Sequence, residues 1–192
     1  SPLRLPTVDV LGMSRDLVQA IAYLRDGQLA DNLDLEREAW LGGSFSSLML
    51  YRAMWELQPD LDALIWVGSI SDAFLMVQSL YDADLAIPPR FQTALAAMGR
   101  PDRDPAFFLG FSPVYNAARM PPTLIAHTLA DEVVPYAQSQ RFAQALQEAG
   151  VEHDLYLYQD TSHYLDQVNI TPETAELYRR LAAFLARHLQ GD

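Results

Sequence analysis

Short strand-like segments alternate with longer helical segments along most of the chain, and this alternation constrains the fold more than any other feature. The segments with the composition or alternation of strands are 38–41, 61–67, 122–127 and 153–158. The segments with apolar residues at helical spacing are 8–26, 47–57, 136–149 and 172–189. Strands joined through helices run parallel, so the pattern predicts an α/β fold: a parallel sheet, flanked by helices whose right-handed crossovers bury both of its faces.

Residues 71–110 interrupt this alternation. The segment mixes helical stretches with prolines at positions 88, 89, 101 and 105, and we expect a cap-like excursion over one end of the sheet. The whole chain, residues 1–192, is predicted to form a single domain. Parallel sheets place their functional sites at the carboxyl ends of the strands, so the loops that follow the predicted strands are the first places to look for chemistry.

The composition excludes several classes of function. The chain has no cysteine, which removes disulfides and thiol catalysis. All 13 basic residues are arginine, which removes Schiff-base and P-loop lysine chemistry. The net charge of −12 would repel nucleic acids and anionic membrane surfaces, and no apolar run reaches the roughly 18 residues of a membrane helix. We therefore expect a soluble protein, with a preference for the cytoplasm.

The turn after the first predicted strand carries a candidate nucleophile, Ser44. It follows Gly42 and Gly43, and small neighbours suit a serine on a sharp strand-to-helix turn, where the backbone is strained and the helix packs close by. Such a turn lifts the hydroxyl clear of the sheet and aims the next N–H, that of Phe45, at a developing oxyanion. The alternative is an ordinary loop in which Ser44 or Ser46 caps a helix.

Two further candidates follow later strands. Asp131 lies in the loop after 122–127, where a carboxylate can orient a histidine, with Glu132 as its rival and a simple turn or helix cap as the alternative. His163 follows the last strand and could act as general base and then general acid. His127 could shape the loop that carries Asp131. The two weaker histidines are His153 and His188.

Together the three candidates stand in the order Ser, Asp, His, which is the order of the α/β hydrolases. The sequence resembles the prolyl oligopeptidase family and the related dienelactone-hydrolase-like and acyl-peptidase-like α/β hydrolases. The segments that carry the resemblance are 42–46, 100–113, 122–125, 127–135 and 150–163. The resemblance covers essentially the whole chain, but only the C-terminal part of the family's catalytic domain.

The resemblance implies an α/β-hydrolase fold without its first strands. It also implies Ser44 as nucleophile, Asp131 as orienting acid and His163 as base, acting on an ester, amide or peptide bond with no cofactor and no metal. The Phe45 N–H supplies one oxyanion donor, and an upstream loop would supply the second. Aromatic residues of the 71–110 segment could line an acyl pocket, although ordinary core packing is the alternative for most of them: Phe74, Tyr81, Phe91, Phe107 and Phe108.

Three departures from the family pattern keep a second function open. Ser46 and Ser47 replace glycines of the turn, Thr128 replaces the glycine after the strand-end histidine, and no His-Gly-Gly-like segment precedes Ser44. The chain could therefore be a catalytically inactive hydrolase-like module that binds a ligand or a partner. A flavodoxin-like phosphate site at the glycines is a third reading, but it leaves Asp131 and His163 without a role.

The first predicted strand would be an exposed edge in such a fold, and exposed edges pair with other chains. We therefore expect a domain that is incomplete at its N-terminus, associated with an N-terminal segment of a longer protein or paired as a homodimer. The predicted ligand is a small ester or peptide substrate.

Overall fold

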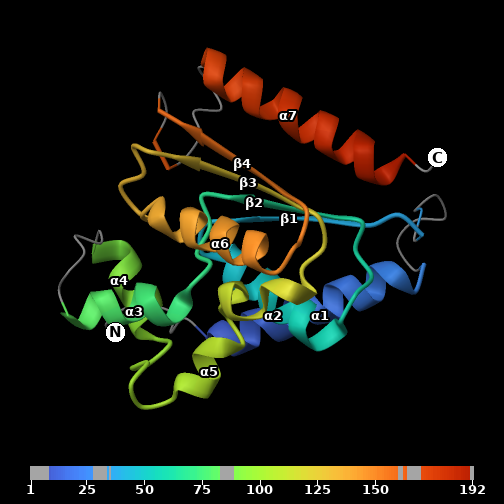
Figure 1. Cartoon of the computed structure of the whole chain (residues 1–192). Helices are drawn as coiled ribbons and strands as arrows, with labels where there is room; N and C mark the ends of the chain where they lie inside the picture. The colour runs from blue at the N-terminus through green and yellow to red at the C-terminus, as the bar shows by residue number, and fades with distance from the viewer. Residues whose placement is uncertain are drawn as a thin grey trace, which may run out of the picture.

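The computed structural model describes residues 9–27, 34, 36–82, 89–159, 162–163 and 170–190. Its centre is a four-stranded sheet in which every neighbouring pair of strands is parallel and the spatial order follows the chain order. The strands are β1 (Ala39–Gly43), β2 (Ala63–Val67), β3 (Thr123–Thr128) and β4 (His153–Tyr158). The predicted parallel sheet is confirmed (Figure 1).

Helices cover the two faces of the sheet unequally. One face packs against α1 (Val10–Arg25), α2 (Ser46–Leu57), α6 (Ala137–Glu148) and the 3₁₀ helix η1 (Pro113–Arg119), whereas α7 (Pro172–Leu189) lies on the other face (Figure 1). No helix in the described part of the chain is long and apolar enough to cross a membrane.

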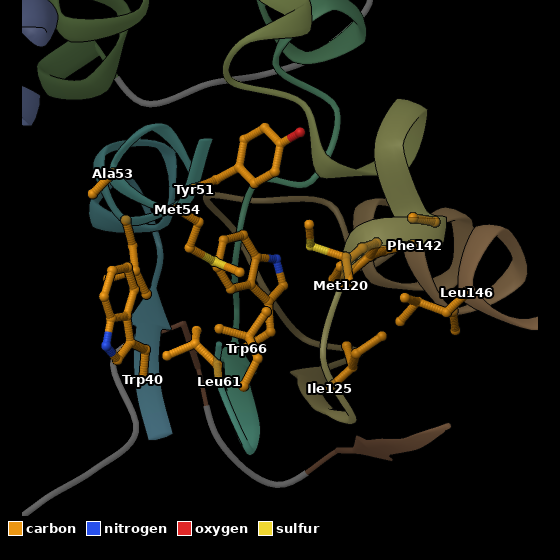
Figure 2. Close-up of a cluster of buried hydrophobic side chains, with 14 of the residues drawn as sticks. Trp40, Tyr51, Ala53, Met54, Leu61, Trp66, Met120, Ile125, Phe142 and Leu146 are labelled. Atoms are coloured by element: carbon orange, nitrogen blue, oxygen red, sulfur yellow. The ribbon is translucent and has the colours of Figure 1, made fainter. Parts of the chain in front are cut away.

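Strand β2 shows how the sheet contributes to both layers. Successive strand side chains point to opposite faces, and Leu64 and Trp66 enter the core beneath α2 and α6, while Ala63 and Ile65 pack toward α7. Trp66 lies in the middle of the larger core (Figure 2) and its indole N–H donates to Ser71 Oγ at 2.9 Å. A run of five apolar residues thus forms a strand that is buried on both sides.

The segment that interrupts the βα alternation contains three helices, α3 (Ala73–Asp82), α4 (Pro89–Ala96) and α5 (Pro105–Leu109). They build a second apolar cluster with the start of α2 and with Val133 and Val134 from the loop after β3. This cluster therefore lies beside the carboxyl ends of the strands, where the candidate residues are found.

The expectation that both sheet faces are buried is wrong at the edges. Leu41 of β1 is 64% exposed and Leu155 of β4 is 39% exposed. Leu41 is in register with Ile65 on the face that α7 covers, but the main sheet contacts of α7 are with β2 and β3, whereas Leu155 is in register with Ile125 on the opposite face. The predicted strand 38–41 also extends further, because Gly42 and Gly43 continue the register opposite Trp66 and Val67.

Gly42 leaves the space that lets α2 pack close to the sheet. A Cβ at this position would lie 2.9 Å from Leu50 Cδ2 and 3.0 Å from Trp66 Cζ3. We expect Gly42→Ala to lower the free energy of unfolding by roughly 1–3 kcal/mol through over-packing, measured by urea denaturation. Gly43→Ala is the matched control, because its Cβ would meet only the Val67 carbonyl at 3.4 Å. Equal losses in the two variants would contradict this account.

Candidate active site

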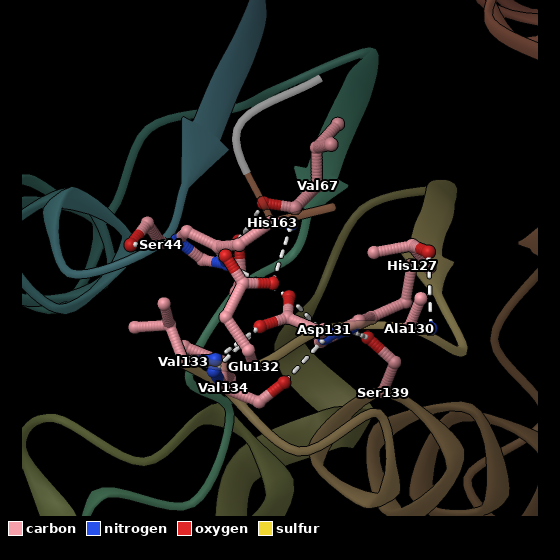
Figure 3. A network of polar contacts seen from close by, with 12 residues as sticks. Ser44, Val67, His127, Ala130, Asp131, Glu132, Val133, Val134, Ser139 and His163 are labelled. Carbon is pink, nitrogen blue, oxygen red and sulfur yellow. Dashed lines mark hydrogen bonds and ion pairs between the residues drawn. The ribbon is translucent and has the colours of Figure 1, made fainter. Parts of the chain in front are cut away.

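Three loops far apart in the sequence meet at the carboxyl edge of the sheet (Figure 3). His163 Nε2 lies 2.7 Å from Ser44 Oγ, and His163 Nδ1 lies 2.7 Å from Asp131 Oδ2. The side chain of Asp131 is fully buried and that of His163 is 4% exposed. The structure thus brings the hydroxyl, imidazole and carboxylate that the sequence singles out into one continuous chain of hydrogen bonds.

Ser44 occupies a strained turn between β1 and α2. Its φ of 51° lies in the left-handed region that side chains disfavour, by about 1–2 kcal/mol. The turn is held because Ser44 N–H donates to Val67 O at 3.2 Å, and Ser47 Oγ donates to Ser44 O at 2.5 Å. The helix-cap alternative for Ser44 and Ser46 is wrong, since the N-cap of α2 is Phe45 and no side chain caps it.

The backbone N–H of Phe45 follows the candidate nucleophile directly. Within the described residues it donates to no acceptor, so it is available to a negatively charged oxygen beside Ser44. Ser46, at a position where the family pattern has glycine, donates its hydroxyl to Gly43 O at 2.6 Å. This bond ties the serine to the turn itself, so the substitution is compatible with the strand-turn-helix geometry.

Asp131 accepts four hydrogen bonds. Its Oδ1 accepts from the N–H groups of Val133 and Val134 at 2.8 and 2.7 Å, which forms the turn expected of an acid in this loop. Its Oδ2 faces His163 and also His127, whose Nε2 is 3.0 Å away. Burial alone would raise the pKa of Asp131, but the hydrogen bonds from the two histidines and the two backbone donors outweigh it and hold that pKa well below its ordinary value.

Glu132, the rival carboxylate, serves a different contact. Its Oε2 accepts from the backbone N–H of His163 at 3.2 Å, so it touches the histidine's loop and not its imidazole. His153 lies at the start of β4 with Nδ1 3.0 Å from Val151 O, and His188 lies 3.4 Å from Glu152. Neither of these histidines belongs to the relay.

Gly68 is a site residue that the sequence analysis missed. It directly follows β2 with a φ of 53°, and a Cβ there would lie 3.6 Å from Asp131 Oδ2 and 3.7 Å from the His163 imidazole. The backbone after β2 therefore forms a wall against the acid–histidine pair. The available signal was a glycine immediately after a predicted buried strand, which often marks a close approach of the backbone.

The cavity next to Ser44 is lined by other residues than those of the predicted aromatic pocket. A small apolar cavity of about 20 Å³ opens beside Ser44, between the loops after β1 and β3 and helices α3 and α4. It is lined by Phe45, Ile70, Met76, Leu95, Val133 and Val134.

None of the five aromatic residues predicted for the acyl pocket lines this cavity as far as the described side chains show. Phe108 is fully buried, and Phe74 and Phe107 pack edge-on against it, so the core-packing alternative holds for these three. Tyr81 is 37% exposed and stacks under Arg100. The side chain of Phe91 lies outside the described residues.

No cluster of three or more histidine, aspartate or glutamate side chains that could hold a metal ion occurs in the part of the chain that the structure describes. The chemistry available at the site is proton transfer between Ser44 and His163, whose imidazole is oriented by a buried carboxylate, next to the Phe45 N–H, which has no acceptor within the described residues.

Comparisons with known proteins identify the family and the fold. The sequence model of the prolyl oligopeptidase family matches residues 12–192. A puromycin-hydrolyzing peptidase of Mycobacterium tuberculosis has 26% identity and a TM-score of 0.73, with 94% of this chain and 26% of that chain covered. An acylaminoacyl peptidase of Pyrococcus horikoshii has 21% identity and a TM-score of 0.73, with 96% and 29% covered. No curated protein matches significantly in sequence.

The same fold occurs outside the peptidases. A hormone-sensitive lipase from a metagenome library has 19% identity and a TM-score of 0.67, with 91% of this chain and 61% of that chain covered. The chain spans about a quarter of the length of the two peptidases. The fold is thus that of the α/β hydrolases, and the chain belongs to the prolyl oligopeptidase family.

Proposed function

We propose that this chain, as a member of the prolyl oligopeptidase family, carries the catalytic triad of a serine hydrolase that cleaves an ester, amide or peptide bond through an acyl-enzyme. One observation carries the proposal: the unbroken relay from Ser44 Oγ through the His163 imidazole to Asp131 Oδ2, with both contacts at 2.7 Å. A hydroxyl is a poor nucleophile by itself, and an adjacent base oriented by a third group is what activates it.

The geometry supports a two-step reaction. Ser44 Oγ attacks the acyl carbon as its proton passes to His163 Nε2, and the oxyanion that forms accepts a hydrogen bond from Phe45 N–H. His163 then gives the proton to the leaving group, whose bond to the acyl carbon breaks. A water molecule then attacks the acyl carbon as its proton passes to His163 Nε2. His163 returns this proton to Ser44 Oγ as the bond between Ser44 and the acyl carbon breaks. Asp131 stays ionised throughout and holds the Nδ1–H tautomer of His163, which leaves Nε2 free to accept.

The proposal needs a second oxyanion donor, because the loss of one such donor typically costs about 10²–10³ in kcat. Among the described residues only Phe45 N–H is assigned to this role. We assign the second donor to a segment that associates with this chain, either from a longer protein or from a second copy. The free backbone edge of β1 is where such a segment would pair, since among the described residues this strand has a hydrogen-bonded neighbour, β2, on one side only.

The proposal is tested by covalent labelling with a fluorophosphonate. A stoichiometric adduct located at Ser44 by peptide mass spectrometry is the expected result, both in the isolated chain and in any longer natural form. A catalytically inactive binding module, the alternative, would leave every form unlabelled. The positive φ of Ser44 and the available Phe45 N–H favour the enzyme. Strained backbone is typical of active sites, and an inactive module would not need it.

The small apolar cavity predicts which acyl groups fit. Its roughly 20 Å³ is little more than the space of one water molecule, so we expect acetyl and propionyl esters to react with higher kcat/KM than hexanoyl esters. Met76→Ala should enlarge the cavity and shift this preference toward the longer acyl chain by roughly tenfold. The ratio of p-nitrophenyl hexanoate to acetate hydrolysis measures the effect independently of the overall rate.

The matched control is Met120→Ala. Met120 is also buried, but it belongs to the core beneath α2 and α6, away from Ser44. It should lower stability without changing the ratio of the two substrates. An unchanged ratio in Met76→Ala would show that this cavity does not receive the acyl group.

A further inference from the structure

The acid of the relay has a second imidazole partner. His127, the penultimate residue of β3, is fully buried, and its Nε2 lies 3.0 Å from Asp131 Oδ2 and 2.9 Å from Val134 O. Its Nδ1 lies 2.7 Å from the hydroxyl of Ser139, on α6. Figure 3 shows His127 on the opposite side of Asp131 from His163. The reaction described above uses neither His127 nor Ser139.

The neighbours of His127 determine where its proton lies. A carboxylate oxygen and a carbonyl oxygen both only accept, so Nε2 must carry a proton and donate to them. Ser139 Oγ is fully buried and makes no other hydrogen bond within the described residues, so its proton is donated to Nδ1. The contacts thus define a neutral imidazole in the Nε2–H tautomer, with Ser139 selecting it.

The same contacts join three consecutive parts of the chain. His127 is the penultimate residue of β3, Asp131 and Val134 belong to the loop that follows, and Ser139 lies in the first turn of α6. Because all of these side chains are fully buried, water cannot replace a missing partner. The loop that carries the acid is therefore anchored to both of the regular elements that flank it.

We propose that His127, with its tautomer set by Ser139, is a positioning residue of the triad: it donates to Asp131 Oδ2 and thereby fixes the oxygen that orients His163. This inference rests on the proposed function. With both backbone donors on Oδ1, the carboxylate has one permitted orientation, and Oδ2 is shared between two imidazoles. His127 also withdraws part of the negative charge that would otherwise act on His163 alone.

Removal of the donor gives the first test. In His127→Leu the rate of fluorophosphonate labelling at Ser44 is expected to fall roughly 10- to 100-fold, because a hydrogen bond to a buried charge is lost. The pH midpoint of labelling should rise, since the freed carboxylate oxygen then favours the protonated imidazole of His163. Among the described residues, Glu132 also lies near His163, where its Oε2 accepts from the backbone N–H, and it is unchanged in the variant.

A conservative replacement of His127 distinguishes a role in positioning the triad from a purely structural role. Gln places an N–H donor near the position of a histidine Nε2, so His127→Gln should recover most of the labelling rate and return the pH midpoint toward that of the parent chain. His153→Gln, at the start of β4, is the matched control and should leave both quantities unchanged. Equal losses in His127→Leu and His127→Gln, with parallel falls in Tm and an unshifted midpoint, would overturn the proposal.

A spectroscopic test does not depend on activity. The chain has only four histidines, so ¹⁵N-detected imidazole spectra can assign each tautomer in the intact protein. We expect the Nε2–H tautomer at His127, and we expect Ser139→Ala to weaken that preference. An Nδ1–H tautomer at His127 would overturn the inference even if Ser44 were labelled. Conversely, absence of labelling with the expected tautomer would refute the proposed function and leave the contact itself intact.

Discussion

Replacing Ser44 by alanine is expected to reduce ester or peptide hydrolysis by roughly 10⁶-fold and to abolish fluorophosphonate labelling. The alanine removes the oxygen that would form the acyl-enzyme in the proposed reaction. His163 Nε2, which lies 2.7 Å from that oxygen, then has no proton to accept. Steady-state hydrolysis of a short-chain p-nitrophenyl ester, followed to the background rate, measures the loss.

Ser46→Ala is the matched control for this experiment. Ser46 is two residues away, and its hydroxyl donates to the Gly43 carbonyl and takes no part in the relay. It should retain hydrolysis and labelling within about threefold, because one exposed local hydrogen bond is worth only about 0.5–1.5 kcal/mol. Residual activity in Ser44→Ala close to that of the parent chain would exclude Ser44 as the nucleophile.

Asp131→Asn is expected to lower kcat by roughly 10⁴-fold with little change in the position of the backbone. The asparagine amide has one acceptor oxygen in place of two, so it cannot accept from the N–H groups of Val133 and Val134 and from His163 at the same time. With its oxygen on the two backbone donors, the amide presents its NH2 to His163 and no longer accepts the Nδ1–H, whereas the opposite orientation would set the NH2 against both backbone N–H groups. Hydrolysis rates of this variant beside those of Glu132→Gln, which keeps the relay, measure the effect.

The same variant tests the electrostatics of the buried carboxylate. The pKa of Asp131 lies below its ordinary value of 3.8 in the folded chain. A group whose folded pKa is depressed stabilises the protein above its unfolded pKa, and that stability is lost as the pH falls through the folded pKa. Asp131→Asn should therefore be less stable at pH 7, by about 1–3 kcal/mol, and the gap to the parent chain should narrow at pH 3.

Urea unfolding of both proteins at the two pH values measures that gap. A gap that is constant with pH would mean that the ionised carboxylate contributes nothing to folding. A gap that widens on acidification would mean that burial, which opposes ionisation, outweighs the four hydrogen bonds.

Much of the fold follows from local features of the sequence. The last helix, α7, has the predicted boundaries Pro172–Leu189, since a proline in its first turn and an uninterrupted amphipathic pattern define it. The β1 boundary was less accurate, because two glycines at a strand end read locally as a turn. Their pairing with Trp66 and Val67 is a property of the sheet and not of the residues themselves.

The three candidate residues of the site were also predictable, because their residue types and their positions after predicted strands are visible in the sequence. Ser44, Asp131 and His163 each follow a predicted strand, and the family prediction built on their order is confirmed. The lining of the apolar cavity beside Ser44 was not predictable: Phe74 and Phe108 were candidates for a pocket, but both pack into the apolar cluster built by α3, α4 and α5. Which apolar side chain faces a cavity depends on how helices dock, and periodicity carries no information on that.

The sequence by itself determined the alternation of strands and helices, the chemical groups at the strand ends and the classes of chemistry that are absent, because periodicity, turn chemistry and composition act locally. Only the tertiary structure decided which atoms meet: that Asp131 offers one oxygen to two imidazoles, that Ser139 selects the tautomer of His127, and that Gly68 closes against the pair. These contacts depend on how strands, loops and helices are placed against one another, and that placement is set by packing of the whole core.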